Sequence, residues 1–195
     1  MIWKVEGNKI IKYQQGHLGR VSNAIAITNK LLILSESELI PYRKKDKWGF
    51  CLPDKRIVID CIYKFVQLYS EGLACVRISD KWGFINKSGD IVIPLIYESA
   101  YPFSEGFACV CLNGKYGFIS KGGGVNIPFI YESSNPFSEG LAAVCLNGKY
   151  GFINKYGDVV INLIYRRADK FSEGLASVRF NGKWGFIHKN GVYSA

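Results

Sequence analysis

The chain has six cysteines and two histidines, the residue types best suited to hold a metal ion or to act as nucleophiles. The cysteines form no CxxC pair and lack the spacing of zinc ligands, and His17 and His188 are far apart in sequence. Free cysteine behaves as a small buried hydrophobe, so we expect reduced core thiols in a cytoplasmic protein, with no metal and no cofactor. Disulfides between repeats are the alternative if the chain is exported. The cysteines are Cys51, Cys61, Cys75, Cys109, Cys111 and Cys145.

A glutamate recurs in the phrase Ser-Glu-Gly, as Glu71, Glu105, Glu139 and Glu173. Paired carboxylates can act as general acid and base, but a catalytic pair is needed once and not in every repeat. We therefore interpret each glutamate as a turn residue beside a glycine that admits a positive φ angle. No GxSxG elbow is present either, and we expect that the protein is not an enzyme.

Large aromatic residues recur at positions 48, 82, 116, 150 and 184, each followed by Gly and Phe. Exposed rings could stack on bases or sugars. In a strand, however, Trp82 and Phe84 share one face, and the glycine between them marks a place where another backbone or ring approaches closely. We interpret the rings as packing residues between repeats.

A row of basic residues is the candidate binding surface. A lysine precedes each aromatic residue at a tight turn, and a second lysine series, Lys87, Lys121, Lys155 and Lys189, is expected to face the glutamates. The turn rim would then be basic, balanced only by Asp46 and Asp80, and with a net charge of +9 it could bind an anionic partner. The alternative is a solvated rim that keeps the protein soluble. The candidate residues are Arg43, Lys44, Lys45, Lys47, Lys81, Lys115, Lys149 and Lys183.

The aromatic residues, the lysines before them and the Ser-Glu-Gly phrases recur at a constant spacing of 34, which indicates a repeat architecture. Within one repeat, short apolar runs are separated by Asn-Gly or Ser-Asp turns, and Asn-Gly is the strongest local signal for a β-hairpin. We expect an all-β fold of three-stranded antiparallel meanders, each closed by an irregular return. Because the strands are apolar on both faces, the sheets should stack face to face in an open curved array. A closed propeller-like ring is the alternative.

The two ends of the chain depart from the repeat. Residues 1–38 resemble repeats whose sequence has diverged, and we predict that they form an N-terminal cap of degenerate β-hairpins. Residues 39–195 would form five repeats, the last one truncated before its third strand. The longest apolar runs, such as Leu31–Leu34, are far too short to span a bilayer, so no membrane association is expected.

The recurring phrase "FSEGLA-V---GKWGFI-K-G-IVIP-IYE" resembles the WG-repeat (KWG-repeat) family of bacterial β-repeat proteins, from Leu39 to Gly191. The resemblance implies an interaction module without catalytic residues. Two functions stay open: a scaffold that binds another protein, and an accessory protein that binds nucleic-acid phosphates along the basic rim. The sequence leaves the partner and the oligomeric state undetermined.

Overall fold

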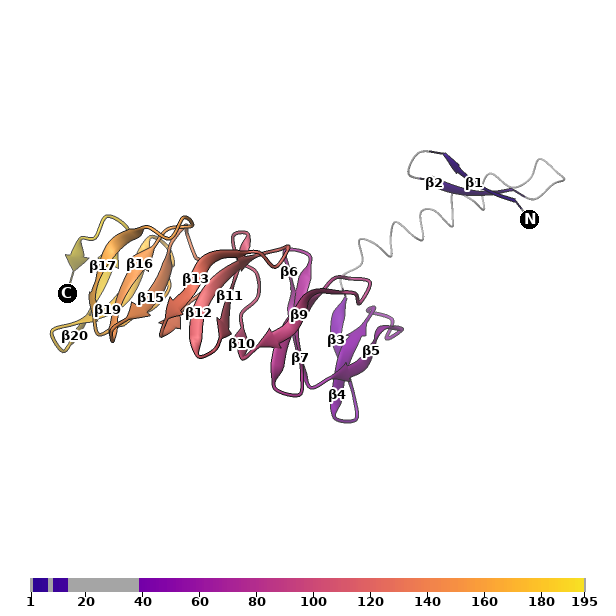
Figure 1. Ribbon diagram of the computed structural model, residues 1–195, viewed down its shortest axis with the longest axis horizontal. Coiled ribbons are helices and arrows are strands. Elements are labelled where there is room, and N and C mark those ends of the chain that lie inside the picture. Colours follow the sequence, from indigo (N-terminus) through magenta and orange to yellow (C-terminus); the bar gives the residue numbers. More distant parts are fainter. Residues whose placement is uncertain (1, 7–8, 14–38, 195) are drawn as a thin grey trace. The chain divides into compact units, whose positions relative to one another are not determined.

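The computed structural model describes residues 2–6, 9–13 and 39–194 (Figure 1). The chain divides into two units, Met1–Glu38 and Leu39–Ala195. In the first unit, β1 (Ile2–Glu6) and β2 (Lys9–Tyr13) form an antiparallel hairpin. The rest of the predicted N-terminal cap lies outside the described residues.

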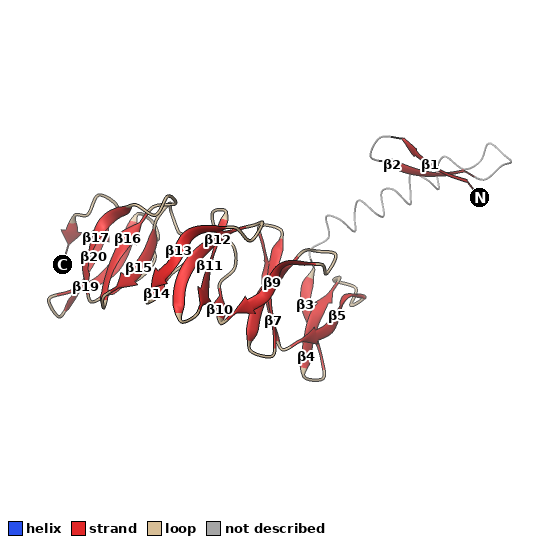
Figure 2. Cartoon of the chain, viewed as in Figure 1, coloured by secondary structure: helices blue, strands red, loops and turns tan. Residues whose placement is uncertain are grey.

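The second unit contains five antiparallel sheets, called sheets 1 to 5 in chain order (Figure 2). Sheet 1 consists of β3 (Ile40–Lys44), β4 (Lys47–Cys51) and β5 (Ile57–Tyr63). Sheet 2 consists of β6 (Phe65–Ser70), β7 (Leu73–Ile78), β8 (Lys81–Ile85) and β9 (Ile91–Tyr97). Sheet 3 consists of β10 (Ser99–Ala100), β11 (Phe107–Leu112), β12 (Lys115–Ser120) and β13 (Val125–Tyr131). Sheet 4 consists of β14 (Ser133–Ser134), β15 (Ala142–Leu146), β16 (Lys149–Ile153) and β17 (Val159–Tyr165). Sheet 5 consists of β18 (Arg167–Ala168), β19 (Leu175–Phe180), β20 (Lys183–His188) and β21 (Tyr193–Ser194).

The lysine before each aromatic residue follows a two-residue turn between neighbouring strands. In sheet 3, Leu112 pairs with Lys115, which leaves Asn113 and Gly114 as the turn. Their φ angles are 52° and 72°, and positive values at both positions define the type I′ turn that the sequence predicts. The glutamates of the Ser-Glu-Gly phrase also have positive φ angles, 51° at Glu71 and 54° at Glu105, as expected of turn residues.

The glycine of the aromatic-Gly-Phe triplet in sheets 1 to 4 lies against the backbone of the next strand. The pairing of β8 with β9 shifts register between Trp82 and Phe84, so β9 bulges opposite Gly83. A Cβ atom on Gly83 would lie 2.6 Å from the carbonyl oxygen of Ile93. The prediction of a close-approach glycine is therefore confirmed.

The return between repeats is more regular than the sequence predicts. Instead of an irregular segment, it supplies an edge strand of the following sheet, as in β10, where Ser99 pairs with Cys111 of β11. Sheets 2 to 5 therefore have four strands. The last repeat, predicted to stop before its third strand, carries the short strand β21 in that place, with Tyr193 opposite Ile187.

Aromatic side chains join successive sheets. Phe84 of sheet 2 packs against Phe103 of the following return, with 4.9 Å between ring centroids. The equivalent pairs Phe50–Tyr69, Phe118–Phe137 and Phe152–Phe171 have centroid distances of 4.9, 4.7 and 4.8 Å. Face-to-face stacking is therefore confirmed, and the core of the unit lies between the sheets.

Figure 1 shows the five sheets of this unit in one open row, with sheets 1 and 5 at its two ends. The predicted all-β array of stacked antiparallel repeats is confirmed in its open form. The end of the row is visible in the exposure of its side chains. Phe152 is fully buried, whereas the equivalent Phe186 of sheet 5 is 54% exposed.

Candidate functional site

The Ser-Glu-Gly phrase links each sheet to the next. The Ser104 hydroxyl donates a hydrogen bond to the Phe137 carbonyl oxygen at 2.8 Å. The Glu105 carboxylate accepts one from the Gly140 amide at 3.0 Å, and Lys155 Nζ lies 3.1 Å from it. Lys121–Glu71 and Lys189–Glu139 are equivalent ion pairs at 3.0 and 2.8 Å. Lys121, Lys155 and Lys189 of the second lysine series thus face the glutamates, as predicted, and the pairs join neighbouring repeats.

The cysteines are free thiols packed in the sheets, and all but Cys61 are buried. The Cys109 thiol points to the Ser134 carbonyl oxygen, and burial raises its pKa to about 12. A thiol with that pKa is almost wholly protonated at neutral pH, so it is a poor nucleophile. Within the described residues, no group of three or more His, Cys, Asp or Glu side chains could hold a metal ion.

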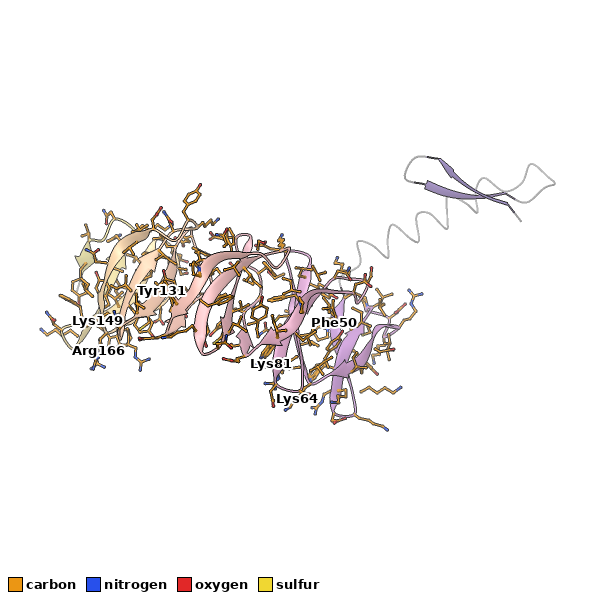
Figure 3. The ribbon with its side chains drawn as sticks, viewed as in Figure 1. Phe50, Lys64, Lys81, Tyr131, Lys149 and Arg166 are labelled. Carbon is orange, nitrogen blue, oxygen red and sulfur yellow. The ribbon has the colours of Figure 1, made fainter. Side chains whose placement is uncertain are left out.

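The predicted rim residues lie at the turns of all five sheets, and every one of them is exposed. Arg43 and Lys44 end β3, Lys45 is in the turn, and Lys47 begins β4. Lys81, Lys115, Lys149 and Lys183 begin β8, β12, β16 and β20. Figure 3 shows Lys64, Lys81, Lys149 and Arg166 along the same edge of the array. The turns therefore form one continuous edge, which we call the rim.

The rim is less basic in its middle than the sequence predicts. Glu98 follows β9, and its Oε2 atom accepts a hydrogen bond from the Gly114 amide at 2.9 Å in the turn of sheet 3. It also lies 4.0 Å from Lys81 Nζ. Glu132 occupies the same place on the turn of sheet 4, 2.9 Å from the Gly148 amide. Asp46 and Asp80 are therefore not the only acidic residues there, which corrects the prediction.

The turn amides lower the pKa of both glutamates. The largest cause is the Gly114 amide for Glu98 and the Gly148 amide for Glu132. A hydrogen bond to the ionised form favours that form. The Asn-Gly turns of sheets 3 and 4 thus each bind a carboxylate through their backbone amides.

Sheet 5 differs from sheets 3 and 4 at this place. Arg166 and Arg179 stand where sheet 4 has Glu132 and Cys145, and no acidic side chain contacts the turn Asn181-Gly182 among the described residues. A shallow groove of about 400 Å³ lies at this turn. It is lined by Lys149, Ile164, Arg166, Arg179, Asn181 and Gly182.

Apolar side chains form a second repeated feature, next to the rim. The strands β5, β9, β13 and β17 lie at one edge of sheets 1 to 4. Near the end of each stands an isoleucine that is about half exposed: Ile62 at 53%, and Ile96, Ile130 and Ile164 at 46% each. Ile164 lines the groove together with Lys149, and the repeat places Ile96 in the same position relative to Lys81. These four isoleucines are called the isoleucine row.

The aromatic residues before the glycines are only partly buried. Trp82 and Tyr116 pack against the cores of their sheets, and Arg77 lies over the Trp82 ring at 5.3 Å. Trp184 in the last sheet is 57% exposed. Tyr150 of sheet 4 packs in the same way, so the predicted packing role holds for sheets 2 to 4 but not for the end of the array.

Sequence reasoning missed Glu98, Glu132, Arg166 and Arg179. A signal was present, because equivalent residues of successive repeats read Lys64, Glu98, Glu132 and Arg166. Where the charge of one position changes sign between otherwise uniform repeats, the contacts of that side chain differ from repeat to repeat. The sequence did not show that this residue meets the turn of the following sheet.

Stacked, blade-like sheets of about 34 residues in an open row define a β-repeat protein. Residues 48–82, 82–116, 116–150 and 150–184 each match the model of the WG containing repeat. The chain belongs to the WG-repeat family, as its sequence predicts.

Solved structures with the same fold have little sequence in common with the chain. Hsv2 of Kluyveromyces lactis has a TM-score of 0.54 and 9% identity over 81% of this chain and 58% of that chain. A eukaryotic initiation factor has a TM-score of 0.55 and 9% identity over 81% of this chain and 52% of its own. The chain thus spans little more than half of these β-propeller-like proteins, and the likeness concerns the fold alone. No curated protein matches the chain in sequence. The described residues include no helix with the length and apolarity needed to cross a membrane.

Proposed function

We propose that the array is a non-enzymatic scaffold that binds another protein along its rim and isoleucine row. The proposal rests mainly on the isoleucine row, whose four members in sheets 1 to 4 are about half exposed and lie beside rim lysines. Exposed apolar groups bordered by charges are typical of protein interaction sites. The partner would present apolar side chains to the row and acidic ones to the lysines.

Contacts through side chains are favoured over strand addition. Pro94 in β9 and Pro128 in β13 interrupt the amide donors of the edge strands. Proline at a sheet edge prevents pairing with a further strand.

Nucleic acid is the second candidate, and the glutamates of the rim disfavour it. A duplex laid along the rim would place phosphates beside Glu98 and Glu132, which repel them. Protein is therefore the partner that the charges support better. We place this function in the cytoplasm, since free buried thiols are typical of reducing compartments.

The test is affinity capture with the full chain from cells of the source organism, with and without nuclease, followed by mass spectrometry. We expect a protein that persists after nuclease, is lost with the double variant Ile96→Ser/Ile130→Ser, and is retained by Tyr156→Ser, an exposed residue outside the row. A partner that nuclease removes would contradict the proposal. So would a log–log salt slope of about −4.5 on duplex DNA, as five phosphate contacts produce.

A further inference from the structure

The turn of sheet 5 has free backbone donors where two other turns are occupied. In sheet 4, the amides of Asn147 and Gly148 donate to Glu132 at 3.2 and 2.9 Å. In sheet 5, neither the Asn181 nor the Gly182 amide has an acceptor among the described residues. The backbone itself is the same, with φ angles of 52° and 69° at Asn147-Gly148 and 47° and 81° at Asn181-Gly182.

The side chains around these donors are basic and form no ion pair among the described residues. Arg166 replaces the glutamate, and Arg179 is held at the turn by a hydrogen bond from its Nε atom to the Gly182 carbonyl oxygen at 3.3 Å. Lys149 of sheet 4 completes the groove, and Figure 3 shows it beside Arg166. In sheet 2, by contrast, Lys64 at the equivalent position pairs with Asp80 at 3.4 Å.

We infer that this groove is a binding site for a carboxylate side chain of a partner protein. The amides of Asn181 and Gly182 receive the carboxylate as those of Asn147 and Gly148 receive Glu132, and Arg166, Arg179 and Lys149 pair with its charge. Ile164 forms the apolar wall of the same groove. The ligand is therefore an Asp or Glu with an apolar neighbour in its own chain. The inference rests on the proposed function and names the chemistry of the partner at one end of the rim.

Other turns of the same chain indicate that a carboxylate fits the groove better than a phosphate. Two turns of the same backbone form already hold a carboxylate, at Glu98 and Glu132. The isoleucine wall also suits an amino-acid side chain next to the acid rather than a sugar-phosphate backbone. Hydrogen bonds from amides to an ionised acceptor are among the stronger kind.

The experiment uses a 12-residue peptide of Glu, Leu, Gly and Ser as the probe, with the same peptide carrying Gln for Glu as the control. It is titrated into the isotope-labelled full chain, and the amide resonances are followed by NMR. We expect the resonances of Asn181 and Gly182 to shift with the Glu peptide and not with the Gln peptide. Those of Gly114 and Gly148 serve as internal controls and should stay in place. Equal shifts at all three turns would overturn the inference.

The variant Arg166→Glu restores the residue type found in the two preceding repeats. Its carboxylate should accept a hydrogen bond from the Gly182 amide and so compete with the peptide. Peptide affinity should therefore fall by about tenfold or more. Lys170→Glu makes the same change of charge in the segment between β18 and β19 and should alter affinity by less than about twofold. An equal loss in both variants would show a non-specific charge effect and overturn the inference. The Gly182 amide resonance of the Arg166→Glu variant without peptide shows directly whether the new carboxylate binds this amide. A folding defect would instead change resonances throughout the chain, so the two effects can be told apart.

Failure of the carboxylate-site inference can be distinguished from failure of the proposed scaffold function. If Arg166→Glu abolishes peptide binding but no protein is captured from cells, the scaffold proposal fails and the site stands. If a protein is captured through the isoleucine row and Arg166→Glu retains it with unchanged affinity, the site has no part in partner binding and the inference is overturned. Tighter binding of an oligonucleotide than of the Glu peptide, with shifts at the same amides, would also overturn it in favour of phosphate.

Discussion

At the scale of single residues, each member of the aromatic-Gly-Phe phrase has a physical role. The glycine allows the bulged third strand to cross over it, and the phenylalanine fills the space between sheets. Gly83 and Phe84 are both fully enclosed, and Phe84 has no exposed surface. The lysine before them is exposed and takes no part in the core. The phrase is therefore mostly scaffold, with one residue per repeat available to a partner.

The substitution Gly83→Ala tests the role of the glycine. Because the new methyl group would lie 2.6 Å from the Ile93 carbonyl oxygen, the backbone of β9 must move. We expect a loss of about 2–4 kcal/mol in the free energy of unfolding, measured by urea denaturation. Gly122→Ala is the control, since no atom lies within 4 Å of its added Cβ and it should change stability by less than about 0.5 kcal/mol. Equal effects would refute the close-approach explanation.

The glutamate of the Ser-Glu-Gly phrase predicts how stability depends on pH. The hydrogen bond from Lys189 lowers the pKa of Glu139 below its ordinary value of 4.5, and the Gly174 amide adds to the effect. A lowered pKa in the folded state stabilises the fold above pH 4.5, and this contribution is lost as the pH falls through the folded value. We expect Glu139→Gln to lower Tm by about 2 °C at neutral pH. The two melting temperatures should converge as the pH falls below the pKa of Glu139 in the folded state. A difference that persists in acid would contradict the ionic explanation.

At the scale of elements, the same three contacts join every pair of sheets from sheet 2 onward. They are the phenylalanine pair, the hydrogen bond from the serine hydroxyl to a carbonyl oxygen, and the hydrogen bond from a glycine amide to the glutamate carboxylate. Ser70, Ser104 and Ser138 donate to carbonyl oxygens of the following repeat at 2.6, 2.8 and 2.7 Å. Repeats with identical neighbour contacts stack without insertions, because any change in length would break the register of all three.

The substitution Ser104→Ala measures one such contact. It leaves the Phe137 carbonyl oxygen without its donor, so we expect a loss of about 1 kcal/mol in the free energy of unfolding. Ser172→Ala is the matched control, because the described residues contain no sixth repeat for its hydroxyl to reach. Thermal and chemical denaturation of both variants would decide the matter. If Ser172→Ala cost as much as Ser104→Ala, the serine would act within its own turn and not between sheets.

At the scale of the whole array, the last sheet carries a face that an additional repeat could cover. Phe186 is 54% and Trp184 57% exposed, although the equivalent Phe50, Phe84, Phe118 and Phe152 are fully buried. In a linear array, each terminal sheet loses the interface energy of one neighbour. The exposed face therefore follows from the open row and not from a change in the repeat itself.

A sixth sheet should stabilise the array. Residues 1–188 followed by residues 155–195 keep the repeat in register and place a copy of Phe171 against Phe186. Because apolar surface is buried and the serine and glutamate contacts are restored, we expect Tm to rise by several degrees, on the order of 5 °C. With phenylalanine in place of the tryptophan in the added copy, the fluorescence maximum of the protein should also shift to the blue, because Trp184 itself is then covered. An unchanged Tm would mean that the face of sheet 5 gains nothing from a neighbour.

The sequence alone determined the repeat length, the all-β class, the type I′ turns and the residues buried between sheets. These features depend on local patterns and on contacts that recur identically in each repeat, so a single period reveals them. It also predicted the lysine–glutamate pairing between the two charged series.

Only the tertiary structure decided which unlike residues meet. The fourth strand of sheets 2 to 5 and the placement of Glu98 on the turn 16 residues later depend on contacts between non-equivalent positions of adjacent repeats. So does the set of basic residues around the turn Asn181-Gly182, where Lys149 comes from sheet 4. A repeating sequence does not show these contacts, because it specifies what each repeat contains but not which side chain of one repeat reaches the turn of the next. The charge of the rim is therefore a property of the stacked array, basic at the Arg166 end and mixed in the middle.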